Sequence, residues 1–195
     1  ASDYYFDNFG VWYQKPAVVD DWTDIVVNGD MEGTSAECFY LTEQGVGGPY
    51  LAPILEGVGK DGSKGIKVES YNNPAYSWDT QFFIRLPYKL PAGTKYKVSF
   101  DYKASNAGGF ETQTHSEPGT YIHFSCIGSG NFSTEWKSYD GEGTISTDQS
   151  KEDKMMQTIA FNLGLNGKAT KFYFDNVKFE VLADVAATLT PNPAS

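Results

Sequence analysis

Two stretches of the sequence combine aromatic rings with polar side chains that suit sugar recognition. In the first, Trp78 precedes residues 81–86, where Gln81, Phe83 and Arg85 alternate with apolar side chains. Sugar rings stack on aromatic faces through apolar C–H patches, and their hydroxyls pair with amide and guanidinium groups. This stretch therefore predicts a carbohydrate contact through Trp78, Gln81 and Arg85. The alternative is that Trp78 and Phe83 are core residues.

The second stretch contains both histidines of the chain. Tyr121 and His123 alternate with the apolar Ile122 and Phe124, and His115 precedes them in a segment that we predict to be a long loop. Two interpretations remain open: unrelated surface histidines, or hydrogen bonds from His115 and His123 to ligand hydroxyls beside a stacking Tyr121. A metal site built on two histidines would lack a convincing third ligand.

Acidic side chains lie near both ends of the chain. Glu32 follows the apolar run at residues 25–27, and Asp175 lies within the aromatic run at residues 171–181. If the first and last strands of a sandwich are neighbours, Glu32 and Asp175 converge on a position that suits a hard cation. The turn at residues 61–65 could add a backbone carbonyl. The alternative is that both acids are solvated surface residues.

No motif in the sequence predicts catalysis. A glycosidase needs two carboxylates in one cleft, and none of the many acidic pairs is favoured by its spacing. The Gly-x-Ser-x-Gly sequence of a nucleophile elbow is absent. A small glycosidase or lyase, and a surface adhesion domain that binds protein, stay as alternatives to a non-catalytic binding module.

The elements that position these residues are predicted to be β-strands. Apolar and polar residues alternate with a period of two over Lys95–Lys103, as in a half-buried strand. Only residues 149–157 have a helical pattern, and this stretch is short. We therefore predict an all-β fold, a jelly-roll β-sandwich of two antiparallel sheets. Further strands are expected around residues 25–27, 66–68, 82–86, 122–126, 159–163 and 171–181.

Length and composition restrict the function classes. The 195 residues suit one domain, with an N-terminal extension or linker at 1–24, the sandwich at 25–182 and a C-terminal linker at 183–195. A net charge of −10 disfavours nucleic acid, whose binders neutralise phosphates with clustered Lys and Arg. No apolar run is long enough for membrane insertion. We expect Cys126 to be a buried free thiol rather than the disulfide partner of Cys38.

Taken in order, several segments resemble the carbohydrate-binding modules of families 4, 9 and 22. The similarity covers roughly residues 25–182. The segments that carry it are VVNGDMEG (26–33), GSKGIKVES (62–70), SWDTQF (77–82), LPAGTKYKVSFDYKAS (90–105), STEW (133–136) and FYFDNVKFEV (172–181).

The resemblance implies a jelly roll with a ligand groove across one sheet and a structural calcium ion away from the groove. In such modules the acids of the opening and closing motifs bind the ion, which points to Glu32 and Asp175. By position in the matching segments, the backbone carbonyls of Asp30 and Lys64 are the expected additional ligands.

The same resemblance assigns the groove. Its stacking rings correspond to Trp78 and Tyr121, and Gln81 stands where a polar sugar contact is expected. Such modules are attached to plant-wall glycoside hydrolases, so we expect a secreted or cell-surface monomer joined to a catalytic domain. The expected ligand is xylan first and β-glucan second.

Overall fold

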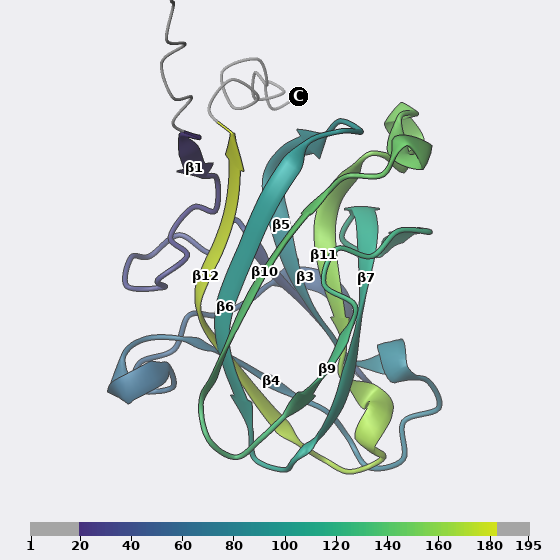
Figure 1. The fold of residues 1–195 in the computed structure, drawn as a ribbon. Coiled ribbons are helices and arrows are strands. Elements are labelled where there is room, and N and C mark those ends of the chain that lie inside the picture. The colour runs from purple at the N-terminus through teal and green to yellow at the C-terminus, as the bar shows by residue number, and fades with distance from the viewer. Residues whose placement is uncertain (1–19, 183–195) are drawn as a thin grey trace, which may run out of the picture.

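The computed structural model describes residues 20–182, which form two antiparallel β-sheets (Figure 1). This confirms the predicted all-β sandwich. Most of the predicted terminal linkers, residues 1–19 and 183–195, lies outside the described residues. No helix within residues 20–182 is long and apolar enough to cross a membrane.

The five-stranded sheet is organised around the C-terminal strand β12. This strand pairs with β1, β4 and β6, and β6 in turn pairs with β10. The strands of this sheet are β1 (Trp22–Asp24), β4 (Ile66–Glu69), β6 (Lys95–Ala104), β10 (Lys137–Thr144) and β12 (Lys171–Leu182).

The seven-stranded sheet has the order β3-β2-β5-β11-β7-β8, and β9 also pairs with β7. Its two central strands are β5 and β11. The strands of this sheet are β2 (Phe39–Glu43), β3 (Gly47–Leu51), β5 (Gln81–Leu90), β7 (Gly108–Glu117), β8 (Thr120–Ile122), β9 (Ser129–Phe132) and β11 (Met156–Asn162).

Aromatic rings fill the space between the sheets. Phe82 of the seven-stranded sheet stacks on Phe174 of the five-stranded sheet with ring centroids 4.2 Å apart. Phe161 meets Phe174 edge-on at 5.2 Å and Phe100 at the same distance. All four side chains are buried. Such pairs stabilise the fold beyond the area that they bury, and they fix which face of each strand points inward.

The two ends of the described chain lie side by side, which is the condition set for Glu32 and Asp175 to converge. The amide of Ile25 donates to the carbonyl of Phe179, and the amide of Val177 donates to the carbonyl of Gly29. The predicted strand at residues 25–27 is wrong, because β1 ends at Asp24. The Asp24 carboxylate accepts hydrogen bonds from the amides of Val26 and Phe179. The bond to Val26, two residues on, turns the chain and ends the strand. The sheet therefore starts at Trp22, three residues before the expected start.

The segment that carries His115 is a strand, β7, and not the predicted loop. Two of its inward-facing residues are the polar Thr112 and Thr114. The sequence therefore lacks the alternation of apolar and polar residues that predicts a strand. Their hydroxyls donate to the carbonyls of Gly128 and Phe124. The strand expected through residues 122–126 instead ends at Ile122, where the Phe124 amide donates to the Ile122 carbonyl at 2.7 Å and closes a tight turn.

Between residues 20 and 182, helical structure is confined to single 3₁₀ turns. The stretch predicted as helical contains two of them, η3 (Thr147–Gln149) and η4 (Glu152–Lys154). The other turns are η1 (Lys60–Gly62), η2 (Ser77–Asp79) and η5 (Gly164–Asn166). Both cysteines are free thiols, Cys38 buried and Cys126 half-buried, which agrees with the expectation of a free Cys126.

Candidate functional site

The candidate site is the face of the seven-stranded sheet that points away from the core, here called the outer face. Core residues of β5, β11 and β7 alternate with the residues that line it, and the strand registers align the latter in three rows. These are the arginine row (Arg85, Thr158, His115 and Tyr121), the middle row (Phe83, Ala160 and Gln113) and the amide row (Gln81, Asn162 and Glu111).

The rows give the outer face a length suited to an extended ligand. Thr158 and Asn162, at the two ends of the face, are four residues apart on β11. At roughly 3.3 Å per residue the two ends are about 13 Å apart. A single sugar ring could not contact both ends, whereas a polysaccharide chain lying along β11 could.

The floor of the outer face contains buried polar groups without partners. Thr158 and Asn162 are fully buried and His115 is 3% exposed. Within the described part of the chain, no hydrogen-bond partner meets the Thr158 hydroxyl, the Asn162 amide nitrogen or His115 Nε2. An unpaired buried polar group costs roughly 1–3 kcal/mol. Three such groups facing the same side indicate a surface prepared for hydrogen bonds to a ligand or to water.

The protonation state of His115 follows from its contacts. Its Nδ1 accepts a hydrogen bond from the amide of Gly119 at 3.1 Å, so the neutral ring carries its proton on Nε2 and offers that N–H as a donor. Burial lowers the pKa of His115 to about 4, and the ring is therefore neutral at pH 7. The interpretation of His115 as a surface histidine is wrong, because the residue lies in the floor beside Phe83.

Gln81 contributes to the site by positioning its neighbour Asn162. It is 7% exposed, and its Nε2 donates to Oδ1 of Asn162 at 2.8 Å. This bond orients the Asn162 amide so that its nitrogen is left as the unpartnered donor. Sequence analysis missed Asn162 and Thr158. Their alternation with apolar residues is visible in the sequence, but their pairing with Gln81 and His115 depends on strand order.

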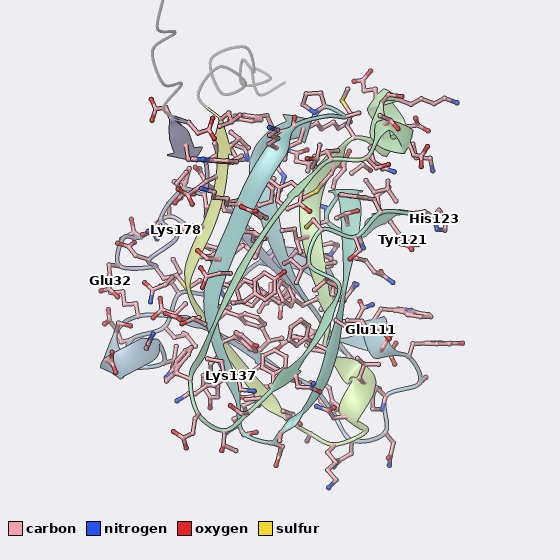
Figure 2. All side chains as sticks on the ribbon, in the orientation of Figure 1. Glu32, Glu111, Tyr121, His123, Lys137 and Lys178 are labelled. Carbon is pink, nitrogen blue, oxygen red and sulfur yellow. The ribbon has the colours of Figure 1, made fainter. Side chains whose placement is uncertain are left out.

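Exposed side chains stand on one side of this floor. Tyr121 is 47% exposed, and its ring meets the exposed His123 edge-on with centroids 4.7 Å apart. Figure 2 shows Tyr121, His123 and Glu111 projecting on the same side of the molecule, opposite Glu32 and Lys178. Arg85 is half-buried at the other end of the arginine row.

Trp78 lies at the amide-row end of the face and is not a core residue. It is 51% exposed in η2, directly before β5, and stacks on Tyr76 with ring centroids 4.8 Å apart and planes inclined by 8°. The amide of Leu163 donates to the carbonyl of Thr80, which ties this segment to the end of β11. Tyr76 was missed because it precedes the alternating stretch. Phe83, by contrast, is fully buried.

The acids predicted to bind calcium converge on one turn, residues 60–64. The Glu32 carboxylate accepts a hydrogen bond from the Lys64 amide at 2.9 Å, and Lys64 Nζ donates to the Glu32 carbonyl at 3.0 Å. Asp30 is exposed, and its carboxylate accepts a hydrogen bond from the Glu32 amide. Glu32 is thus tied to Lys64 at the surface through the amide and the ammonium group of that lysine.

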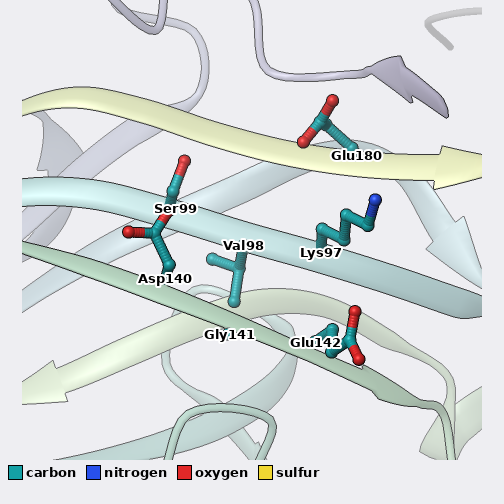
Figure 3. Close-up of a pocket in the computed structure, with 7 residues that line it drawn as sticks. All are labelled: Lys97, Val98, Ser99, Asp140, Gly141, Glu142 and Glu180. Carbon is teal, nitrogen blue, oxygen red and sulfur yellow. The ribbon is translucent and has the colours of Figure 1, made fainter.

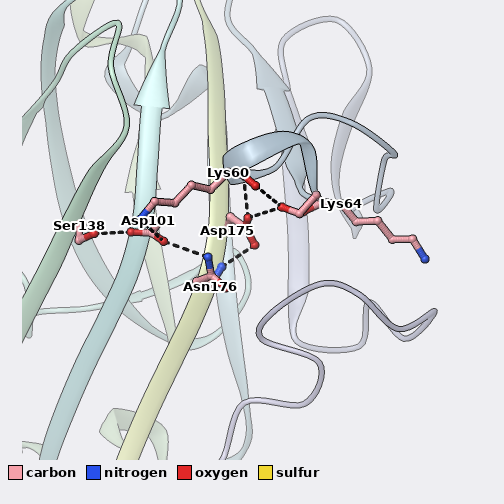
Figure 4. A network of polar contacts seen from close by, with 7 residues as sticks. Lys60, Lys64, Asp101, Ser138, Asp175 and Asn176 are labelled. Carbon is pink, nitrogen blue, oxygen red and sulfur yellow. Dashed lines mark hydrogen bonds and ion pairs between the residues drawn. The ribbon is translucent and has the colours of Figure 1, made fainter.

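Asp175 is buried at the other side of the same turn (Figure 4). It accepts hydrogen bonds from the Lys60 amide at 2.8 Å, the Ser63 hydroxyl at 2.9 Å and the Asn176 amide at 2.7 Å. Burial raises the pKa of Asp175 against the lowering effect of these bonds. The Lys60 ammonium pairs with Asp101 instead, at 3.1 Å.

This turn combines carboxylate oxygens, which a hard cation prefers, with the ammonium group of Lys64 at the Glu32 carbonyl. Asp175 is a buried acid whose three donors are neutral, so a bound cation would compensate its charge. Residues 20–182 contain no group of three or more His, Cys, Asp or Glu side chains able to hold a metal. A calcium ion here would therefore need backbone carbonyls, such as those of Asp30 and Lys64, beside the carboxylates of Glu32 and Asp175.

A shallow hollow of about 310 Å³ lies on the five-stranded sheet (Figure 3). Asp140 and Glu142 border it and are exposed, and Glu180 is half-buried. Lys97 lies in the same hollow and covers the ring of Trp22 at 4.2 Å. Because Asp140 and Glu142 are exposed, this hollow has the character of a solvated surface.

Several solved structures with the same architecture contain carbohydrate-binding modules. A structure described as "CBM4 structure and function" matches with a TM-score of 0.57 and 20% identity, over 80% of this chain and 99% of that chain. The CBM22-1 and GH10 modules of Clostridium thermocellum xylanase 10B, complexed with xylohexaose, match with a TM-score of 0.54 and 15% identity. The match covers 88% of this chain and 30% of that chain.

A third match is the N-terminal cellulose-binding domain of Cellulomonas fimi β-1,4-glucanase C. Its TM-score is 0.51 at 14% identity, over 80% of this chain and 95% of that chain. No protein-family model and no curated protein matches the sequence. The chain thus has the fold of the carbohydrate-binding modules of families 4 and 22, which confirms the resemblance seen in the sequence at the level of architecture.

Proposed function

We propose that this chain is a non-catalytic module that binds a plant cell-wall polysaccharide along the outer face. The observation that carries the proposal is the combination of exposed rings, Trp78 and Tyr121, with a floor of buried polar groups that have no partners. Aromatic faces and unpaired donors are the two elements that sugar recognition needs. The fold shared with known carbohydrate-binding modules supports the same function.

Each element of the face has a role in this proposal. Trp78 and Tyr121 stack on sugar rings, each contributing about 1 kcal/mol beyond area burial. Arg85, His115 and His123 pair with hydroxyl groups, and Gln81 holds Asn162 in position to do so.

Xylan is the first ligand in the proposal and β-glucan the second. One similar structure is a xylanase module solved with xylohexaose, and another is a cellulose-binding domain of a glucanase. By the same analogy the module is a monomer joined to a glycoside hydrolase that it brings to its substrate. Since plant-wall polysaccharides lie outside cells, the function requires a secreted or cell-surface protein.

We also propose that a structural calcium ion occupies the turn at residues 60–64. Glu32 and Asp175 would supply carboxylate oxygens, and Asp30 and Lys64 backbone carbonyls. The ion would neutralise the buried charge of Asp175 and hold the first segment against β12. It would take no part in sugar binding, because Figure 2 places Glu32 on the opposite side of the molecule from Tyr121.

Isothermal titration with xylohexaose and cellohexaose tests the proposed function. Saturable binding at one site, tighter for xylohexaose, is the expected result. Incubation with xylan and β-glucan, followed by assay of reducing ends, should release nothing. Absence of binding to both oligosaccharides would contradict the proposal and favour a protein-binding adhesion domain. Release of reducing ends would indicate a glycosidase.

A further inference from the structure

The arginine row differs chemically from the rest of the outer face. Its members, Arg85, Thr158, His115 and Tyr121, are consecutive neighbours across β5, β11, β7 and β8. With strands about 4.8 Å apart, the row spans three inter-strand steps. One sugar ring therefore covers only part of the row, and a sugar that lies over Thr158 and His115 could direct a substituent toward Arg85.

The free hydrogen-bonding capacity of this row consists mainly of donors. His115 offers Nε2–H, because its Nδ1 is occupied by the Gly119 amide. Arg85 is half-buried and forms no ion pair with another residue in the range 20–182. A guanidinium carries five donors and no acceptor. The Thr158 hydroxyl can donate or accept, so the complementary ligand group is one that only accepts.

The opposite end of the face offers both hydrogen-bond donors and acceptors. The amide row holds the Asn162 nitrogen as a donor and the exposed Glu111 carboxylate as an acceptor. This mixture suits neutral hydroxyls, which both donate and accept. Because the two ends are about 13 Å apart, a negative charge bound near Arg85 is kept away from Glu111, which would repel it.

We propose that the arginine row is a subsite for a carboxylate-bearing sugar, a uronic acid on the bound polysaccharide, with Arg85 pairing to the carboxylate. Carboxylate and guanidinium match as a bidentate pair, and charge-assisted hydrogen bonds are about twice as strong as neutral ones. The inference rests on the proposed function, and it narrows the ligand class to an acid-substituted xylan.

The test compares two xylo-oligosaccharides of equal length, one carrying a uronic acid and one unsubstituted, by isothermal titration. The wild-type protein should bind the acidic oligosaccharide about tenfold more tightly, a difference of about 1.4 kcal/mol, because hydrogen bonds to a charged group are stronger than those to a neutral one. In R85Q the ratio of the two affinities should fall to near one. R85K, which keeps the charge but loses the bidentate geometry, should retain part of the preference.

K178Q is the matched control, because it removes one exposed positive charge on the opposite side of the molecule (Figure 2). Its affinity ratio should equal that of the wild type. Equal binding of both oligosaccharides by the wild type, or an unchanged ratio in a folded R85Q, would overturn the acidic subsite and leave the proposed function standing. Failure of the wild type to bind either oligosaccharide would instead contradict the proposed function.

Discussion

Single residues on the outer face owe their chemistry to burial. His115 is held neutral with one free N–H, and Asn162 is oriented by Gln81 so that its nitrogen is left as an unpartnered donor. Burial of these groups without partners destabilises the protein. A ligand that supplies hydrogen-bond acceptors would offset part of this free-energy cost. The exposed rings of Trp78 and Tyr121 supply apolar contact on either side.

Burial of His115 makes the stability of the protein dependent on pH. Its folded pKa of about 4 lies below the unfolded value of 6.5, so the unfolded state binds the proton more readily. The resulting loss of stability is absent above pH 6.5 and grows to about 3 kcal/mol as the pH falls to 4. Denaturant unfolding at several pH values should show this slope, and it should be smaller in His115→Gln.

His123→Gln is the control for this effect, because His123 is exposed. Its slope between pH 4 and 6.5 should match that of the wild type. A His115→Gln slope identical to wild type would show that His115 is not buried as a neutral ring.

Trp78 should contribute directly to affinity. Trp78→Ala removes a 51% exposed ring that stacks on Tyr76, so the fold should remain intact while xylohexaose binds roughly tenfold more weakly. The control is Trp136→Ala, whose half-buried ring contacts Lys103 of the other sheet. Titration of both variants against wild type is the measurement. Equal losses of affinity in the two variants would argue against an outer-face site.

At the scale of elements, strand β12 links the fold to the proposed calcium turn. Asp175 of β12 receives the Lys60 amide, while the carbonyl of Val177 lies against Gly29, where a Cβ atom would approach within 1.9 Å. The opening segment can thus lie against β12 only with glycine at position 29. A bound ion between Glu32 and Asp175 would join the same three segments.

Removal of calcium should lower the melting temperature. An ion that binds only the folded state stabilises by about 2.7 kcal/mol at a hundredfold excess over its dissociation constant. Melting curves with calcium and with a chelator should therefore differ by several degrees, and Asp175→Asn should lose the difference. Xylohexaose affinity should be the same in both conditions. Identical melting curves for the wild type would rule out a stabilising ion.

The sequence predicts regular elements better than irregular ones. Alternation identified β4, β5, β6, β11 and β12, because their inward residues are apolar. It failed for β7, where Thr112 and Thr114 face the core, and for residues 25–27, where Asp24 ends the strand. Residue type was enough to name six candidate sugar contacts. The place of Thr158 and Asn162 in the floor follows from the order of the strands in the sheet, and alternation along one strand carries no information about that order.

The whole molecule separates two surfaces with different properties. The outer face of the seven-stranded sheet has exposed rings and unpartnered buried groups, whereas the five-stranded sheet bears the solvated hollow of Figure 3 and the network of Figure 4. The phenylalanine core between the sheets holds these surfaces apart. Ligand binding should therefore affect one sheet and leave the other unchanged.

An NMR titration of the labelled protein with xylohexaose is the most direct test that the ligand binds the outer face of the seven-stranded sheet. The Trp78 indole and the backbone amides of Tyr121, Asn162 and Thr158 should shift progressively and saturate together, while those of Lys178, Asp140 and Glu142 stay in place. Shifts confined to the five-stranded sheet, with the outer-face signals unmoved, would contradict the account.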